Sequence, residues 1–433
     1  QNLGFSPLLY GVIAFIPRFF DAITDPIMGF ISDNTRSRYG KRRQYVFLGA
    51  IITGISFILM WQLYIENGIV FNFWYFLLCS LVFYLGITIF GIPFVAMGYE
   101  MSDDFHERTK IMAVSQFIGQ FAWIIAPWIW VIIYDPAIFA DPAAGTRELS
   151  IYIGIACTIF AITPAIFIKS RSTIDDDNLV PLTRKNIGAS FSNIFNIFKD
   201  AYKNIPFRKL CLATFLVFNS FQTIAAFSFF IIVHYLFSGD ASSAGIWPTL
   251  HGSVGALITT LLVIPVVSKM AQKYGKRQTF IVSQSISIIG YILFWFLFIP
   301  GKPYMFLYAL PFFSFGIGGL FTVMMSMTAD VCDYEELQNG LPRKEGAFGA
   351  IYWWMVKLGT ALAGLFAGLI MWYVGFAPDA ASQPDGALFG LRFFYTFIPI
   401  MGTSLAIFVM WDYDIDEKRA TEIKEELLIR NNS

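Results

Sequence analysis

The stretch Arg18-Phe19-Phe20-Asp21-Ala22-Ile23-Thr24-Asp25-Pro26 places three charged side chains inside a segment that is otherwise apolar enough to cross a bilayer. A charge at the centre of a membrane-spanning helix costs about 2.5–3.5 kcal/mol on insertion scales, so such charges usually face protein and act on ions or substrates. Asp21 and Asp25 stack on one helix face, with Arg18 one turn earlier. With the Thr24 hydroxyl they predict a cation site. A buried salt bridge that only joins helices is the alternative.

The composition is that of an integral membrane protein. Hydrophobic residues make up 56% of the chain and charged residues 14%, and the mean hydropathy is +0.61, which is far from the usual soluble balance. The net charge of zero gives no reason to expect a nucleic-acid partner. The cysteines show no CxxC spacing and the histidines no HExxH pattern, so we expect no cofactor and no metal beyond the cation of the predicted site.

Apolar runs near or above the length of a membrane span predict an all-α integral membrane protein with eleven helices. The runs are residues 6–31, 45–65, 73–101, 111–134, 149–168, 207–237, 245–268, 279–299, 303–329, 346–376 and 388–412. Basic residues gather in alternate connections, namely 32–44, 102–110, 169–206, 269–278, 330–345 and the tail after 412. By the positive-inside rule these connections and the C-terminus are cytoplasmic. We expect a multi-pass protein of the cytoplasmic (inner) membrane.

An internal repeat divides the chain into two similar halves. Tyr39-Gly40-Lys41-Arg42 recurs as Tyr274-Gly275-Lys276-Arg277, in each case after a long apolar run. A second pair joins GIPFVAMGYEMSDDF (91–105) to GLFTVMMSMTADVCDY (319–334), and each of these is expected to leave the membrane in an acidic loop. Such repeats are typical of transporters. The second half has one apolar run more than the first, so we expect that a first helix is absent from this chain. A genuine eleven-helix protein is the alternative.

This organisation resembles the major facilitator superfamily and, within it, the glycoside–pentoside–hexuronide:cation symporter family. The resemblance rests on FDAITDPIMGFISDNTRSRYGKR (20–42), IPFVAMGYEMSDDFHERTK (92–110), ADVCDYEE (329–336) and RKEGAFGAIYWWMVKLG (343–359). It implies the major facilitator fold of two pseudo-symmetric six-helix bundles. The expected domains are an N-terminal bundle at 1–168 (family helices 2–6), a cytoplasmic linker with an interfacial helix at 169–206, a C-terminal bundle at 207–412 (family helices 7–12) and a cytoplasmic tail at 413–433.

The resemblance also implies a secondary active transporter, not an enzyme, that couples Na⁺ or H⁺ to symport of a sugar or glycoside by alternating access. The family's cation site matches Asp21, Thr24, Asp25 and Thr88, and the hydroxyl of Thr24 in place of the family's amide leaves the choice of ion open. The family's midplane lysine matches Lys357. Three sugar-binding positions hold other residue types, so the identity of the sugar stays open. The expected cytoplasmic gate consists of Asp33, Arg36, Arg38, Lys41 and Arg42.

Polar and aromatic side chains at helical spacing complete the predicted substrate site. Its residues are Arg18, Gln116, Gln120, Trp123, Asn219, Gln222, Phe321, Tyr352, Trp353 and Lys357. Tryptophans of interfacial belts and amides that bridge helices are the alternatives. The positive charges of Arg18 and one bound cation balance the negative charges of the two aspartates. The positive charge of Lys357 would then be balanced by an acid of the absent helix or by the solute. The second option predicts an anionic sugar, such as a uronate or a sulfonated sugar.

Two other functions stay open. One is cation-coupled transport of a lysolipid or another amphiphile, because a related animal branch moves lysophospholipid and Phe-rich helices suit an acyl chain. The other is an intramembrane enzyme, for which the chain offers no nucleophile–base pair. The expected partners are a small saccharide, the coupling cation and the lipid bilayer, and we expect a monomer.

Overall fold

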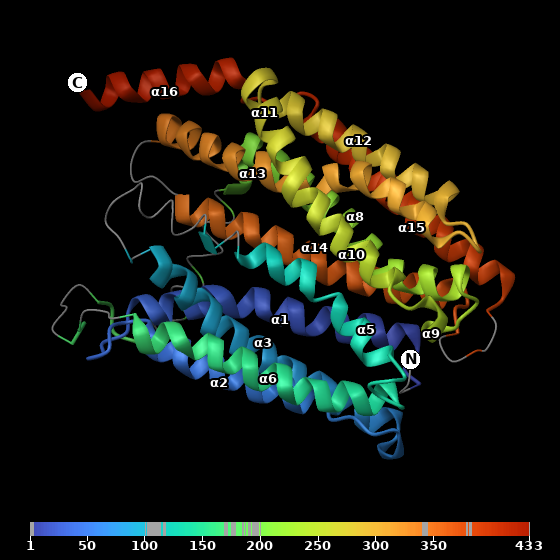
Figure 1. Cartoon of the computed structure of the whole chain (residues 1–433). Coiled ribbons are helices and arrows are strands. Elements are labelled where there is room, and N and C mark those ends of the chain that lie inside the picture. Colours follow the sequence, from blue (N-terminus) through green and yellow to red (C-terminus); the bar gives the residue numbers. More distant parts are fainter. Residues whose placement is uncertain are drawn as a thin grey trace. The chain divides into compact units, whose positions relative to one another are not determined.

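The regular structure of this chain, in the computed structural model, is helical. The structure describes residues 4–99, 101, 114–115, 118–168, 172–174, 179–183, 186, 188, 192, 199, 201–339, 345–377, 380 and 383–432, and these ranges contain no strand. In chain order the elements are α1 (Pro7–Asp33), α2 (Arg43–Met60), η1 (Ile65–Asn67), α3 (Ile69–Tyr99), α5 (Trp128–Tyr134), α6 (Pro142–Phe167), α8 (Ile205–Phe230), η2 (Ile231–Leu236), α9 (Ala241–Ala244), α10 (Trp247–Ile258), η3 (Thr259–Val263), α11 (Ile264–Tyr274), α12 (Lys276–Leu297), η4 (Pro303–Ala309), α13 (Leu310–Asn339), α14 (Glu345–Tyr373), α15 (Asp385–Met410) and α16 (Glu417–Asn432) (Figure 1).

Ten helical stretches of the described chain are long and apolar enough to cross a membrane. They match ten of the predicted runs in order. The remaining run, 111–134, lies partly outside the described residues, and its described part holds a shorter apolar helix at Ile118–Tyr134. Large apolar side chains such as Phe160 and Phe408 expose 77% and 76% of their surface, as lipid-facing residues do. The chain is a multi-pass membrane protein.

The end of α13 differs from the prediction. An acidic loop was expected from residue 330, but α13 continues to Asn339. The carboxylate of Asp330 pairs with Lys276 at 2.5 Å, and that of Glu336 pairs with Arg430 at 3.1 Å. The prediction is wrong because the end of an apolar run marks a change in hydropathy and not the end of a helix, and α13 continues with acids that have basic partners.

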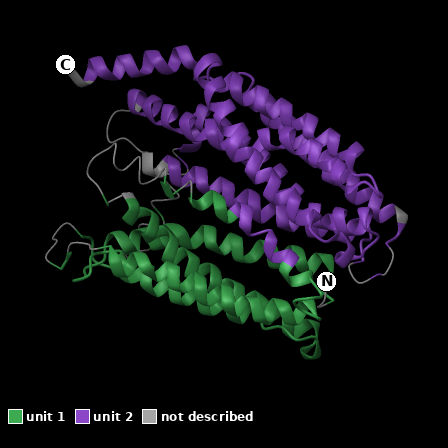
Figure 2. Cartoon of the chain, in the orientation of Figure 1, with its two compact units in different colours: residues 1–122, 132–196 green, residues 123–131, 197–433 purple. Residues whose placement is uncertain are grey.

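The chain divides into two compact units. Unit 1 comprises residues 1–122 and 132–196, and unit 2 comprises 123–131 and 197–433 (Figure 2). The segment 123–131 belongs to unit 2 because α10 bonds to it: the hydroxyls of Thr249 and Ser253 donate to the carbonyl oxygens of Pro127 and Ile124, at 2.7 and 2.6 Å. Much of the expected linker at 169–206 lies outside the described residues, so the predicted domain boundaries stay a prediction.

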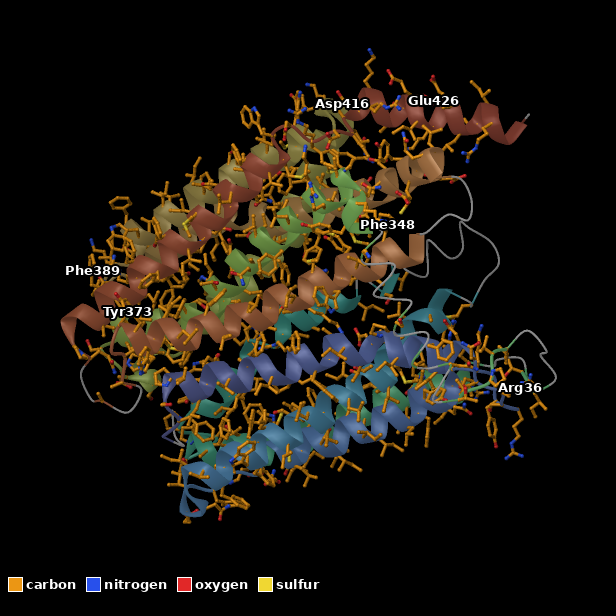
Figure 3. The ribbon with its side chains drawn as sticks, turned by 180° about the vertical axis from the view of Figure 1, so that it is seen from behind. Arg36, Phe348, Tyr373, Phe389, Asp416 and Glu426 are labelled. Atoms are coloured by element: carbon orange, nitrogen blue, oxygen red, sulfur yellow. The ribbon has the colours of Figure 1, made fainter. Side chains whose placement is uncertain are left out.

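The buried core of unit 2 has two parts. One lies around Phe207, Val217, Met324 and Tyr352 and includes Ile423 of α16. The other surrounds a cluster of aromatic rings: Tyr291, Phe294, Phe298, Phe306, Phe313 and Tyr395. Within this unit, Tyr373 and Phe389 lie at one end and Asp416 and Glu426 at the other (Figure 3). The tail helix α16 is anchored to this core, because Ile423 is fully buried.

The two YGKR segments both hold their glycine at a positive φ. Gly40 has a φ of 83° and Gly275 a φ of 82°, a region that side-chain-bearing residues rarely adopt. A helix begins within three residues of each glycine: α2 at Arg43 and α12 at Lys276. The repeat seen in sequence thus includes a glycine with positive φ shortly before a helix in each half.

The Arg392 side chain joins three elements of unit 2. Its guanidinium donates to the Tyr235 hydroxyl and to the Trp295 carbonyl oxygen, both at 2.7 Å, and it lies 4.1 and 4.8 Å from the centroids of the same two residues' rings. Replacing Arg392 with Gln is expected to lower the free energy of unfolding by about 1–3 kcal/mol, because two partly buried oxygen acceptors lose a charged donor. Thermal unfolding of the purified protein measures the change, and exposed Lys302→Gln is the control. Equal midpoints for the two variants would contradict the expectation.

Candidate functional site

Helices α1 and α3 of unit 1 lie side by side and carry the predicted cation site (Figure 1). The start of α1 is fixed by the Ser6 hydroxyl, which accepts a hydrogen bond from the Leu9 N–H, and by Pro7 in the first turn. Asp21 is 5% exposed, and Thr88 of α3 is 2% exposed. These polar groups therefore face protein rather than lipid, as the cost of a lipid-facing charge requires.

The Thr88 hydroxyl lies between the two aspartates. Its Oγ1 is 2.7 Å from Asp21 Oδ1 and 3.2 Å from Asp25 Oδ1. The hydroxyl of Thr24 lies 3.1 Å from that of Thr88 and donates to the main-chain oxygen of Asp21, also at 3.1 Å. The structure brings together all four side chains that the sequence analysis assigned to the cation.

This arrangement favours a bound positive charge. A hydroxyl has one hydrogen, so Thr88 can donate to only one carboxylate at a time. Two ionised carboxylates on either side of one oxygen repel each other, so a proton or a cation between them stabilises the group. Carboxylate, hydroxyl and carbonyl oxygens are the ligands of hard cations. The described residues contain no cluster of three or more His, Cys, Asp or Glu suited to a metal ion, so any cation held here would depend on the hydroxyls as well.

Arg18 bonds to its own helix. Its guanidinium donates to the main-chain oxygen of Ala14 at 3.0 Å, one turn toward the start of α1. Its predicted contact with the solute stays a prediction.

The predicted lysine lies on α14 of unit 2, between two anchored turns. Trp353, one turn before Lys357, stacks against Phe321 of α13 with ring centroids 6.0 Å apart. One turn after Lys357, two amides of α8 reach α14: Asn219 donates to the carbonyl oxygen of Gly359 at 3.1 Å, and Gln222 donates to the Thr360 hydroxyl at 3.3 Å. Five predicted substrate residues of unit 2 therefore share this region of α8, α13 and α14.

Other predicted substrate residues are placed differently. Tyr352 has no exposed surface, so its contact with a solute would require α14 to rearrange. Trp123 is 70% exposed and Gln120 is partly buried. Gln116 lies outside the described residues. Their roles remain predictions.

Sequence reasoning missed Gly359 and Thr360, the partners of the two amides. Helical periodicity identifies residues that share a face of one helix. It cannot predict which faces of two helices contact each other when the helices are well over a hundred residues apart in sequence. The nearest signal was the position of both residues within one turn of Lys357.

The predicted gate residues form contacts within unit 1. Arg42 is buried and pairs with Asp33 at 2.6 Å. Arg38 stacks over the Tyr39 ring at 4.7 Å, Arg36 is exposed and Lys41 is partly buried. A latch between the halves, formed by this basic loop, stays a prediction.

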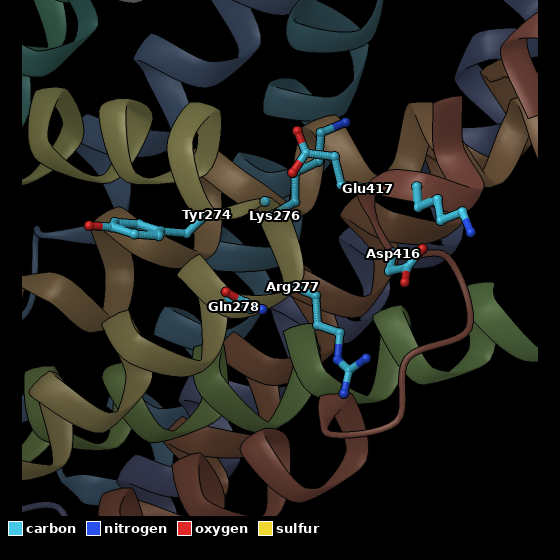
Figure 4. Close-up of a pocket in the computed structure, with 8 residues that line it drawn as sticks. Tyr274, Lys276, Arg277, Gln278, Asp416 and Glu417 are labelled. Atoms are coloured by element: carbon cyan, nitrogen blue, oxygen red, sulfur yellow. The ribbon is translucent and has the colours of Figure 1, made fainter. Parts of the chain in front are cut away.

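A pocket in unit 2 lies where α11, α12 and α16 approach one another. Its lining residues are Tyr274, Gly275, Lys276, Arg277, Gln278, Asp416, Glu417 and Lys418 (Figure 4). Both acids and bases line it, so it has no clear preference for one sign of charge. None of the residues predicted to bind solute lines it.

Comparisons with known proteins agree with this architecture. The family model described as "MFS/sugar transport protein" matches residues 1–417. The glucuronide carrier protein homolog of Escherichia coli (strain K12) is 23% identical over 427 residues, which cover 98% of this chain and 88% of that protein. The putative glycoside/cation symporter YagG of the same organism is 20% identical over 429 residues, with 98% and 88% covered.

A solved structure has a similar fold. It is that of a bacterial homologue of the human lysosomal transporter Spinster, in an inward-facing and occupied conformation. The TM-score is 0.66 at 13% identity, and the match covers 95% of this chain and 89% of that one. At this identity the likeness concerns the fold alone.

Proposed function

Since this chain belongs to the MFS/sugar transport protein family, we propose that it is a cation-coupled symporter of a sugar or glycoside, with an acidic sugar as its preferred solute. The family and its relatives are transporters rather than enzymes. The observation that carries the cation coupling is the Thr88 hydroxyl between the carboxylates of Asp21 and Asp25. One relative is named a glycoside/cation symporter, which supports the same reading.

Two observations support an acidic solute. A cationic side chain, Lys357, shares a region of unit 2 with the stacked rings of Trp353 and Phe321, and sugars bind to such surfaces through ring stacking and charged hydrogen bonds. One relative is named a glucuronide carrier homolog, and glucuronides carry a carboxylate.

The mechanism that we propose is linkage between ion and solute. Bound Na⁺ or H⁺ neutralises the acid pair and favours the conformation that binds solute, so the two binding events stabilise each other. The loaded protein then exposes the site to the other side of the membrane. Basic connections on the cytoplasmic side of the inner membrane, with a cytoplasmic C-terminus, fit the positive-inside rule, and a monomer suffices for this cycle.

Uptake into proteoliposomes tests the proposed function. A labelled glucuronide, the matching neutral glucoside and a lysophospholipid are compared under a Na⁺ gradient, a pH gradient or neither. Accumulation of the glucuronide above equilibrium only with an ion gradient is expected. Movement of the lysophospholipid without sugar uptake would support an amphiphile transporter instead. Sugar that equilibrates regardless of ion gradients would exclude symport.

Replacing Lys357 with Ala is expected to raise the half-saturating concentration of the glucuronide about tenfold or more, because hydrogen bonds to charged groups contribute about 1.5–3 kcal/mol. The neutral glucoside should change much less. Initial rates of uptake at varied solute concentration measure both. Lys269→Ala, at an exposed position of α11, is the control. Equal losses for the acidic and neutral solutes would remove the acidic preference from the proposal.

A further inference from the structure

The turn of α14 that follows Lys357 is bonded to α8 by two side-chain amides. Asn219 Nδ2 lies 3.1 Å from the Gly359 carbonyl oxygen, and Gln222 Nε2 lies 3.3 Å from Thr360 Oγ1. Asn219 and Gln222 are both partly buried, so these bonds are shielded from full competition with water. Both amides act on the same turn, and together they resist its rotation and its sliding along α8.

The chemistry of the acceptors fixes which end of each amide faces α14. A main-chain carbonyl can only accept, so Asn219 must present its NH₂ group to Gly359. The Thr360 hydroxyl donates its hydrogen to the Val356 carbonyl oxygen at 3.1 Å, so it accepts from Gln222. The NH₂ group of each amide is therefore used in holding α14.

Helices α8 and α14 are in contact at this turn. A Cβ added at Gly359 would lie 3.5 Å from the Asn219 main-chain nitrogen and 3.6 Å from the Phe215 carbonyl oxygen, which are ordinary contact distances. At this separation the short amide of Asn219 reaches a backbone oxygen of α14, and such side-chain hydrogen bonds join membrane helices.

Trp353, Lys357 and Thr360 follow one another at four and three residues, so they lie on one face of α14. The turn before the lysine is anchored to α13 through the stack of Trp353 on Phe321. The turn after it is anchored to α8 through Gln222. Lys357 therefore lies on a helix face that is fixed from both sides.

We propose that Asn219 and Gln222 are positioning residues, which hold Lys357 at the height and orientation needed to select acidic over neutral sugars. This inference rests on the proposed function of Lys357. It assigns the two amides to helix α14 rather than to the solute, so their effect on solute selection passes through the lysine.

The test uses a substitution that removes the hydrogen bond from Gln222 to Thr360 without altering the side chain of Asn219 or Gln222. Thr360→Val keeps the side-chain shape but takes away the acceptor of Gln222. Both Thr360→Val and Gln222→Ala are expected to raise the half-saturating glucuronide concentration by about three- to tenfold, the effect of one hydrogen bond between membrane helices. The half-saturating glucuronide concentration of the double variant should be no higher than that of either single variant, since all three lose the hydrogen bond between Gln222 and Thr360. The neutral glucoside should keep its half-saturating concentration.

Further variants separate positioning from general damage to the fold. Thr360→Ser restores a hydroxyl and should restore the ratio of acidic to neutral half-saturating concentrations. Asn219→Ala should shift that ratio in the same direction as Gln222→Ala. Ser285→Ala, on an exposed face of α12, is the matched control and should leave the ratio unchanged. Every rate is normalised to the folded protein recovered in the proteoliposomes.

Four results would overturn the inference. If Gln222→Ala shifts the ratio and Thr360→Val does not, Gln222 acts on the solute directly. If both variants lower acidic and neutral uptake equally, the bridge only supports the fold. If Lys357→Ala itself leaves the acidic preference intact, the proposed role of the lysine fails and the inference fails with it. A loss of preference in Lys357→Ala alone would overturn the inference while sparing the proposed function.

Discussion

Replacing Asp21 or Asp25 with Asn is expected to abolish accumulation of solute against its gradient, so that the internal concentration falls to the external one. Each substitution removes one negative charge from the pair that flanks the Thr88 hydroxyl. The remaining carboxylate is then no longer repelled by the other one, so the stabilisation gained from a bound cation falls. Solute should still exchange across the membrane, since the substitution leaves unit 2 unchanged.

The measurement compares uptake under an ion gradient with exchange at equal ion concentrations. Glu66→Gln is the matched control, because Glu66 is an exposed acid of η1 in the same unit. Thr88→Val should retain both charges and lose the bridging hydroxyl, which should weaken the dependence on ion concentration without abolishing accumulation. Full accumulation in both aspartate variants would show that coupling resides elsewhere.

Adding one methyl group at Gly49 or Gly290 is expected to destabilise the fold by about 3 kcal/mol or more, at the upper end of overpacking costs. A Cβ at Gly49 would lie 2.7 Å from the Cα of Phe90, and one at Gly290 would lie 2.8 Å from the Cα of Phe313. Both neighbours are backbone atoms, so no change of rotamer relieves the overlap. The helices of the pairs α2–α3 and α12–α13 would have to move apart.

Thermal unfolding and the yield of monodisperse protein measure this effect for Gly49→Ala and Gly290→Ala. Gly91 of α3 provides the control, since an added Cβ there meets nothing within 4 Å. Gly91→Ala should be neutral or slightly stabilising, because alanine favours helices by about 1 kcal/mol over glycine. Wild-type stability in both Gly49→Ala and Gly290→Ala would mean that these helix pairs are more loosely packed than the structure describes.

The membrane spans could be predicted from sequence because length and hydropathy determine them locally. The grouping of Asp21, Thr24 and Asp25 was also predictable, since the helical repeat places them on one face. The position of Thr88 of α3 beside these residues could not be predicted from the local sequence. It came only from the resemblance to a symporter family, and no periodicity within α1 could have supplied it.

The least predictable parts depend on partners far away in sequence. Asn219 and Gln222 are polar residues in an apolar helix, which suits either a solute or another helix, and only the position of α14 reveals the bonds that they form. Asp330 of α13 likewise pairs with Lys276, which lies far from it in sequence. In both cases a polar group is stabilised by a partner that the local pattern does not contain.

The left-handed turns at Gly40 and Gly275 have a consequence for tracing the ancestry of this chain. Their φ angles differ by one degree. Stereochemistry penalises any replacement of glycine at such torsions, whereas lipid-facing positions accept many apolar residues. The two glycines are therefore expected to persist as markers of a duplicated half even where the lipid-facing positions of the halves diverge.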